Sequence, residues 1–251
     1  MKEFFKHLLY EPMYNALIGI INFLPVWADV GIAVIILTIL VRLILFPLSI
    51  KAVRTQAKMK LLQEPMKELQ EKYKNNREEL GRKMLEMYRK EGVNPFASIL
   101  LILIQLPILL TLYFVFSHSG LPVVNMDLLY SFMHVPETLN MHFLGLIDIA
   151  APKNVLLSLI AAATQYFQIR FAMPVIPPKV KNPTLKDDLA RNMSLQMRYI
   201  MPIITFFISY SLVSVIAVYW IISNLFSIGQ EIYVRKHIHN VSDKSPEKLP
   251  A

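Results

Sequence analysis

An arginine interrupts the first long apolar stretch of this chain. Arg42 lies within residues 30–50, which are otherwise apolar or neutral and are long enough to cross a bilayer as a helix. Near the centre of such a helix an arginine costs about 2.5 to 3.5 kcal/mol, and an intramembrane charge is commonly functional. The Leu, Ile, Val and Phe side chains of the stretch, at about −0.4 kcal/mol each, outweigh that cost. We therefore expect a membrane-spanning helix whose charge has a role.

The composition of the whole chain agrees with a membrane protein. Its 251 residues are 55% hydrophobic, and the mean hydropathy is +0.44, which is too apolar for a soluble domain of this size. The chain has no cysteine. Disulfides, thiolate metal sites, a cysteine nucleophile and a lipid-modified cysteine are therefore excluded within this sequence.

Apolar runs alternate with charged segments and predict an all-α polytopic membrane protein with five transmembrane helices and a cytoplasmic helical hairpin. Residues 1–27 are expected to form an interfacial amphipathic helix. The transmembrane helices are expected at residues 28–50, 94–116, 152–173, 197–212 and 213–235. The intervening segments are the cytoplasmic hairpin (51–93), an extracytoplasmic loop (117–151), a cytoplasmic loop (174–196) and a cytoplasmic tail (236–251).

The distribution of basic residues predicts the orientation. Residues 51–93 hold 12 Lys or Arg against 7 Glu, whereas residues 117–151 hold no Lys or Arg. Because cytoplasmic loops carry the excess of basic residues, five spans place the N-terminus outside and the C-terminus in the cytoplasm. We expect a multi-pass protein of the cell membrane.

The segment 51–93 has the periodicity of two antiparallel helices. Apolar residues, Tyr73 among them, recur at helical spacing on both sides of Asn75 and Asn76, which supply the turn. Pro65 is expected to kink the first helix because it lacks a backbone donor. The alternative is a pair of solvated charged helices with no partner.

Neutral polar residues in other spans offer surroundings for Arg42. No Asp or Glu is expected at its depth, so water, backbone carbonyls or a transient anionic group would have to be its partner. Each neutral group alone is typical of helix–helix hydrogen bonding, and Arg42 alone could snorkel to the interface. Together they predict a water-containing cavity open toward the cytoplasm. These residues are Gln105, Thr164, Gln165, Gln168, Tyr219, Ser223 and Asn224.

Motifs for catalysis are missing from the sequence. It contains no GxSxG, HExxH or phosphate-binding glycine loop, and no paired intramembrane aspartates. His118, His134 and His142 are irregularly spaced, so a metal site is not expected. We predict a protein that is not an enzyme and needs no cofactor.

Five segments, in order, resemble the YidC/Oxa/Alb family of membrane protein insertases, in a short form without the large exported domain. They are residues 31–48 (GIAVIILTILVRLILFPL), 58–74 (KMKLLQEPMKELQEKYK), 92–116 (GVNPFASILLILIQLPILLTLYFVF), 143–148 (FLGLID) and 219–230 (YWIISNLFSIGQ). Two motifs depart from the family pattern. Residues 97–100 (ASIL) replace a Gly-Cys-Leu-Pro stretch, and residues 209–214 (SYSLVS) replace a Pro-Gly link.

The resemblance implies a function. A family member inserts nascent membrane proteins without nucleotide hydrolysis, through a hydrophilic groove that contains the arginine matched here by Arg42. Phe167 and Trp220 would contact the substrate helix, and the hairpin would recruit substrate. The implied partners are nascent membrane proteins and lipid, with the Sec translocon, a ribosome or a targeting receptor as further candidates, and no specific nucleic acid.

Two other functions remain open from the residues alone. Arg42 could bind an anionic solute in a channel or transporter, or the chain could be a non-transporting assembly factor in which Arg42 is structural. The identity of the substrates does not follow from the sequence.

Overall fold

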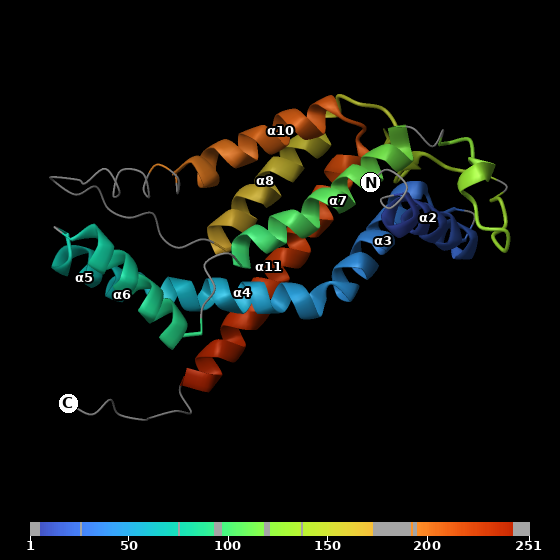
Figure 1. Ribbon diagram of the computed structural model, residues 1–251. Helices are drawn as coiled ribbons and strands as arrows, with labels where there is room; N and C mark the ends of the chain where they lie inside the picture. Colours follow the sequence, from blue (N-terminus) through green and yellow to red (C-terminus); the bar gives the residue numbers. More distant parts are fainter. Residues whose placement is uncertain are drawn as a thin grey trace.

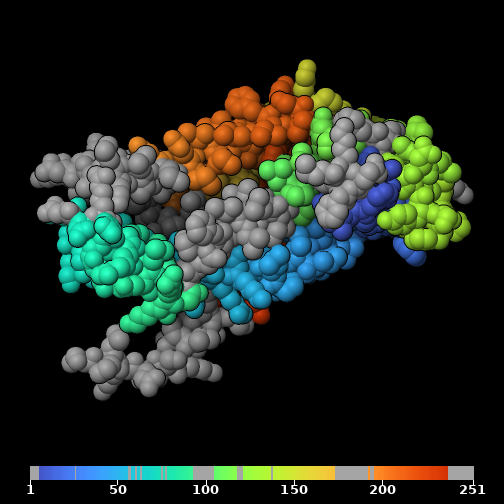
Figure 2. Space-filling view, in the orientation of Figure 1, coloured from blue at the N-terminus to red at the C-terminus, as the bar shows by residue number. Residues whose placement is uncertain are grey.

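The computed structural model describes residues 6–25, 27–74, 76–92, 97–117, 121–136, 138–172, 192 and 195–242, and most of them are helical (Figure 1). Long helices run side by side through the centre. A helical hairpin, in the segment where the sequence predicts one, projects from one end, and α2 and residues 121–136 lie at the other (Figure 2). We call this second end the loop end.

The N-terminal segment consists of a π-helix, η1 (Lys6–Tyr10), followed by α2 (Glu11–Phe23). A proline in the first turn of α2 suits a helix start, where the missing N–H has no intrahelical partner. One face of α2 buries Tyr14, Leu17 and Ile18, and the helix packs against α3. The segment predicted to lie in the membrane interface is therefore also part of the packed core.

The first apolar stretch forms two helices, α3 (Val30–Ile44) and α4 (Phe46–Leu61). They are bent by 66° at the break. Pro47 accounts for the bend because it cannot donate to the carbonyl of Leu43, and its ring would clash with that carbonyl. The helix predicted over residues 28–50 is thus broken at Leu45, and its second part continues into the segment predicted to be the hairpin.

The hairpin helices are α5 (Gln63–Lys72) and α6 (Arg77–Lys90). The chain is interrupted at Leu62, and Pro65 lies in the first turn of α5. The Asn76 side chain caps α6 by accepting a hydrogen bond from the Glu79 backbone N–H at 3.1 Å. Asn75, the other predicted turn residue, lies outside the described residues. The Tyr88 hydroxyl donates to Met66 Sδ at 3.4 Å and joins the two helices.

The remaining long helices are α7 (Ala97–Ser117), α8 (Val155–Ala172), α10 (Met201–Ser211) and α11 (Val215–Ser242). A π-helix, η3 (Gln196–Ile200), precedes α10. α8 packs against both α10 and α11, and α11 also packs against α3.

Length and apolar composition identify the helices that could cross a membrane. Among the described residues, Val155–Ala172 and Val215–Lys236 are long and apolar enough, and the bent pair Val30–Ile44 with Phe46–Thr55 would be a third. The chain is therefore a mostly helical membrane protein with two or three candidate spans.

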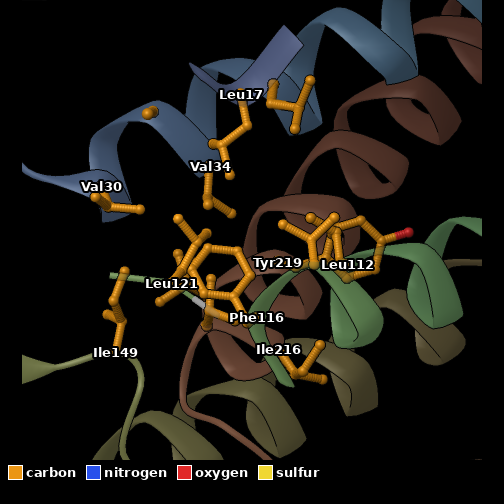
Figure 3. Packing of buried hydrophobic residues seen from close by; sticks show 14 of the residues in the cluster. Leu17, Val30, Val34, Leu112, Phe116, Leu121, Ile149, Ile216 and Tyr219 are labelled. Atoms are coloured by element: carbon orange, nitrogen blue, oxygen red, sulfur yellow. The ribbon is translucent and has the colours of Figure 1, made fainter. Parts of the chain in front are cut away.

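The apolar core lies toward the loop end and is built from several segments (Figure 3). Leu17 of α2, Val34 of α3, Leu112 of α7 and Ile216 of α11 are all buried in it. The core therefore joins the N-terminal segment to the central helices.

A small hairpin ties the helix ends together at the loop end. It consists of β1 (His142–Phe143) and antiparallel β2 (Ile147–Asp148), and a 3-10 turn, η2 (Met126–Leu128), precedes it. A Cβ on Gly31 would lie 2.4 Å from Phe143 Cδ2, so only glycine allows β1 to approach the start of α3 this closely. Backbone N–H groups of Val30 and Val215, which begin α3 and α11, donate to Asn140 and Ile149 at 2.9 Å.

Candidate functional site

Arg42 lies in the last turn of α3 and is half-buried. Its Nη2 donates a hydrogen bond to Gln105 Oε1 of α7 at 2.7 Å. Gln105 Nε2 in turn donates to the Tyr219 hydroxyl of α11 at 2.5 Å. Three of the residues predicted to surround one cavity therefore form a connected chain across α3, α7 and α11. We call Arg42, Gln105 and Tyr219 the arginine chain.

The arginine chain contains no counter-charge. Among the described residues, every ion pair lies elsewhere, and Arg42 has no carboxylate partner. A hydrogen bond to a charged group is worth about 1.5 to 3 kcal/mol, so Gln105 offsets part of the cost of burying Arg42. It does so without neutralising the charge. The guanidinium remains a net positive charge, half-buried where the side chain of Arg42 meets α7.

A second set of predicted residues joins α8 to α11. Asn224 Nδ2 donates to Thr164 Oγ1 at 3.2 Å, and the Thr164 hydroxyl donates to the backbone carbonyl of Ala161 at 2.9 Å. Gln165 and Gln168 are hydrogen-bonded to each other at 3.3 Å along α8. These side chains have partners on α8 and α11, as polar groups between packed membrane helices commonly do. The structure thus divides the predicted polar set into the arginine chain and an α8–α11 contact.

The other predicted site residues have different environments. Ser223 is buried one turn after Tyr219, and its carbonyl accepts a hydrogen bond from the Ser227 hydroxyl at 2.8 Å. Phe167 is exposed on α8, whereas Trp220 is half-buried and packs against the apolar core. Of the two residues predicted to contact a substrate helix, Phe167 is therefore the more accessible.

Two sets of polar contacts made by the second half of α11 were not predicted from the sequence. Gln230 Nε2 of α11 donates to the Ser49 hydroxyl of α4 at 2.6 Å. Further along α11, the almost fully buried Glu231 pairs with Arg235 Nε at 3.0 Å, and Arg235 Nη2 donates to the carbonyl of Phe171. The spacing of Glu231 and Arg235 by four residues was a usable signal, because such pairs share a helix face.

A groove lies between α5 and α6, and Pro65 is the one predicted hairpin residue among those that line it. The groove has a volume of about 500 Å³, and Pro65 forms part of its apolar wall. Tyr73 directly follows α5, and its backbone N–H donates to the carbonyl of Leu69 at 3.0 Å. The hydrogen bond from Lys83 Nζ to Glu86 Oε2, at 2.9 Å, is the main cause that lowers the pKa of Glu86. The groove is therefore lined by both apolar and charged side chains. The remaining residues that line the groove are Leu62, Glu68, Leu69, Lys72, Met87, Lys90 and Glu91.

Residues 22–242 match the family model described as 60Kd inner membrane protein. This chain belongs to that family. A protein named Membrane protein insertase YidC, from Clostridium tetani (strain Massachusetts / E88), is 32% identical over 207 residues, which cover 82% of this chain and 81% of that relative. The family resemblance read from the sequence is therefore confirmed.

Longer relatives share the same name. Membrane protein insertase YidC from Francisella tularensis subsp. novicida (strain U112) is also 32% identical over 207 residues, and the match covers 82% of this chain but 32% of that protein. The relative from Francisella tularensis subsp. tularensis (strain WY96-3418) gives the same values. This chain therefore corresponds to about a third of the Francisella relatives. The family match includes α3, α7 and α11, which carry the arginine chain.

Proposed function

We propose that this protein is a membrane protein insertase. It would carry the hydrophilic end of a nascent membrane protein across the bilayer while the apolar segment of that protein enters the lipid. The observation that carries the proposal is the arginine chain, in which a half-buried positive charge is held by a neutral amide. The insertase name of the relatives supports the same function.

The mechanism follows from the cost of moving polar groups through lipid. An unpaired polar group buried in hydrocarbon costs several kcal/mol, so a crossing segment needs a hydrated path. Arg42 would attract water and an acidic segment into a groove between the helices, because Coulomb attraction is strong at low dielectric. No covalent step is needed, so we propose insertion without nucleotide hydrolysis and without catalytic residues. Phe167 and Trp220 would contact the incoming apolar helix.

The proposal includes a topology. Five transmembrane helices, an N-terminus outside and a C-terminus in the cytoplasm would put residues 51–93, with 12 Lys or Arg, on the cytoplasmic side. In that orientation Arg42 lies above the bend at Leu45, and the hairpin extends from α4 toward the cytoplasm. A cysteine replacing Glu68 should react with a membrane-impermeant maleimide in inverted vesicles and not in intact cells. Labelling in intact cells alone would contradict this orientation.

The groove between α5 and α6 supports a recruiting role for the hairpin. Its lining of apolar and charged side chains suits a short amphipathic segment of a substrate or of a targeting factor. We propose nascent membrane proteins as the first partners, and the Sec translocon, a ribosome or a targeting receptor as factors that deliver them.

An insertion assay in proteoliposomes tests the function. The substrate is a single-span protein with a short acidic exported tail, and protection of that tail from added protease reports insertion. We expect Arg42→Ala to abolish protection and Arg42→Lys to retain most of it, because lysine keeps the charge. Equal activity of the wild type and both variants would contradict the electrostatic mechanism.

The same preparation separates the two other functions. Steady anion-selective conductance in a planar bilayer, without insertion, would indicate a channel. Loss of insertion on deletion of the hairpin, together with full activity of Arg42→Ala, would indicate an assembly factor.

A further inference from the structure

Four large apolar side chains are exposed close to the start of α3. Phe23 and Trp27, which are 93% and 77% exposed, belong to the end of α2 and the turn that precedes α3. Leu144 and Leu146, which are 66% and 84% exposed, belong to the tip of the β1–β2 hairpin. We call these four residues the apolar rim. A cluster of this kind usually marks an interaction surface.

Hydrogen bonds hold the two parts of the apolar rim together. Asp29 caps α3 by accepting from the Ile32 backbone N–H at 2.9 Å, and its second carboxylate oxygen accepts from the Leu144 N–H at 2.9 Å. The carbonyls of Asn140 and Ile149, on either side of the β1–β2 hairpin, also accept hydrogen bonds. The donors are the backbone N–H groups of Val30 and Val215, the first residues of α3 and α11. The rim is therefore fixed at the level where α3 and α11 begin. A helix that spans a membrane leaves the hydrocarbon at its end, so this level is the membrane–water interface.

The backbone at Leu144 adds an independent argument. Leu144 has a φ of +52°, in the left-handed region, and Gly145 follows with a φ of +73°. A side chain other than glycine costs roughly 1 to 2 kcal/mol there, and turns of this kind prefer Asn, Asp or Gly. An exposed leucine at this position is thus unfavourable for the turn and also unfavourable in water. Both costs are offset if the side chain enters an apolar medium.

We propose that the apolar rim inserts into the interfacial layer of the bilayer and anchors the loop end of the protein to lipid. Tryptophan and phenylalanine are suited to this layer, where an apolar ring meets headgroups. Residues 117–151 contain no Lys or Arg, so the contact is apolar and does not require anionic lipid. The anchor sets the depth of the start of α3, and through it the depth of Arg42. The anchor needs only residence in a membrane and does not depend on the insertase function.

Tryptophan fluorescence tests the anchor in the full chain. The chain has two tryptophans, Trp27 and Trp220, so the W220F variant reports on Trp27 alone. The protein is placed in nanodiscs of zwitterionic lipid that is brominated either near the headgroup end of the acyl chain or near its methyl end. We expect a loss of Trp27 emission that is larger with the shallow bromine than with the deep one.

A reporter in the β1–β2 hairpin completes the test. The Leu146→Trp substitution in a W27F/W220F background should show the same preference for the shallow bromine. The matched control is Arg82→Trp in that background, because the Arg82 side chain is 64% exposed on charged α6. Its emission should respond to aqueous acrylamide and not to bromine. If the emission of Trp27 and of the Leu146→Trp reporter is quenched by acrylamide as strongly as the control and is unaffected by bromine, the rim faces water and the proposal is wrong.

Discussion

Arg42 and Arg235 are two arginines on apolar helices with different partners. Arg235 lies four residues after Glu231 on α11, pairs with its carboxylate at 3.0 Å and donates to the carbonyl of Phe171 on α8. Arg42 donates to the neutral amide of Gln105. The charge of Arg235 is neutralised, and this side chain joins two helices. The charge of Arg42 is held in place and remains positive. The partner, and not the residue type, separates a structural arginine from one able to attract a substrate.

The most direct test of the difference between the two arginines is to place a carboxylate beside Arg42. Gln105→Glu places an acid within hydrogen-bond distance of the guanidinium, where a pair of unit charges about 4 Å apart interacts by about 4 kcal/mol at an effective dielectric constant of 20. We expect insertion of a substrate with an acidic tail to fall at least about tenfold, since 1.4 kcal/mol already corresponds to tenfold. The proteoliposome protease-protection assay measures this.

A matched control is Gln105→Met. It removes the hydrogen bond but leaves the charge of Arg42 unpaired, so insertion should fall much less than in Gln105→Glu. If Gln105→Glu inserts as well as the wild type, the positive charge of Arg42 is not what acts on the substrate.

The converse change removes the partner of Arg235. Glu231 is 2% exposed and the Arg235 side chain is 42% exposed, so we expect Glu231→Gln to lower the free energy of unfolding by about 1 to 2 kcal/mol, the range for a hydrogen bond to a partly solvated charge. Thermal unfolding in detergent measures the loss, and insertion at a permissive temperature should stay near the wild-type level. Arg42→Ala should show the opposite pattern, with insertion lost and stability kept. A Glu231→Gln variant that is stable but inactive would remove the distinction between the two arginines.

Accessibility to a water-soluble reagent tests which residues in and around the arginine chain face water. Gln105 and Gln165 are half-buried, whereas Ser223 is buried. Cysteines at positions 105 and 165 should therefore react with a maleimide added from the cytoplasmic side, and a cysteine at position 223 should react far more slowly. Equal rates at all three positions would indicate a hydrated space that extends past Tyr219.

The smallest expected effect concerns the hairpin, where ion pairs are exposed. Lys83 lowers the pKa of Glu86, so the charged form of Glu86 favours the folded hairpin. This contribution is present above the ordinary pKa of a glutamate and is lost as the pH falls through the lowered folded-state value. Glu86→Gln should slightly reduce helix content by circular dichroism near pH 7 and should match the wild type in strong acid. A difference that grows on acidification would contradict the assigned direction.

Several features followed from the sequence because they depend on neighbouring residues along one chain. Mean hydropathy predicted a membrane protein, Asn76 was expected at the hairpin turn and caps α6, and ordered motifs identified the family, which the comparisons confirmed. The bend at Leu45 was also within reach, since Pro47 is visible in the sequence, but hydropathy alone favoured a continuous helix over residues 28–50.

Only the tertiary structure decided which polar groups meet. Tyr219, Asn224 and Gln230 lie on one helix, yet they contact α7, α8 and α4 respectively. Helical periodicity places a residue on a face, but packing among several helices determines what that face touches. For the same reason the sequence could show that no acidic residue was expected at the depth of Arg42 in any span, but not that Gln105 would hold the guanidinium. The charge and the lack of an acid at its depth followed from the chain itself, and the neutral amide that holds the guanidinium was determined by the fold.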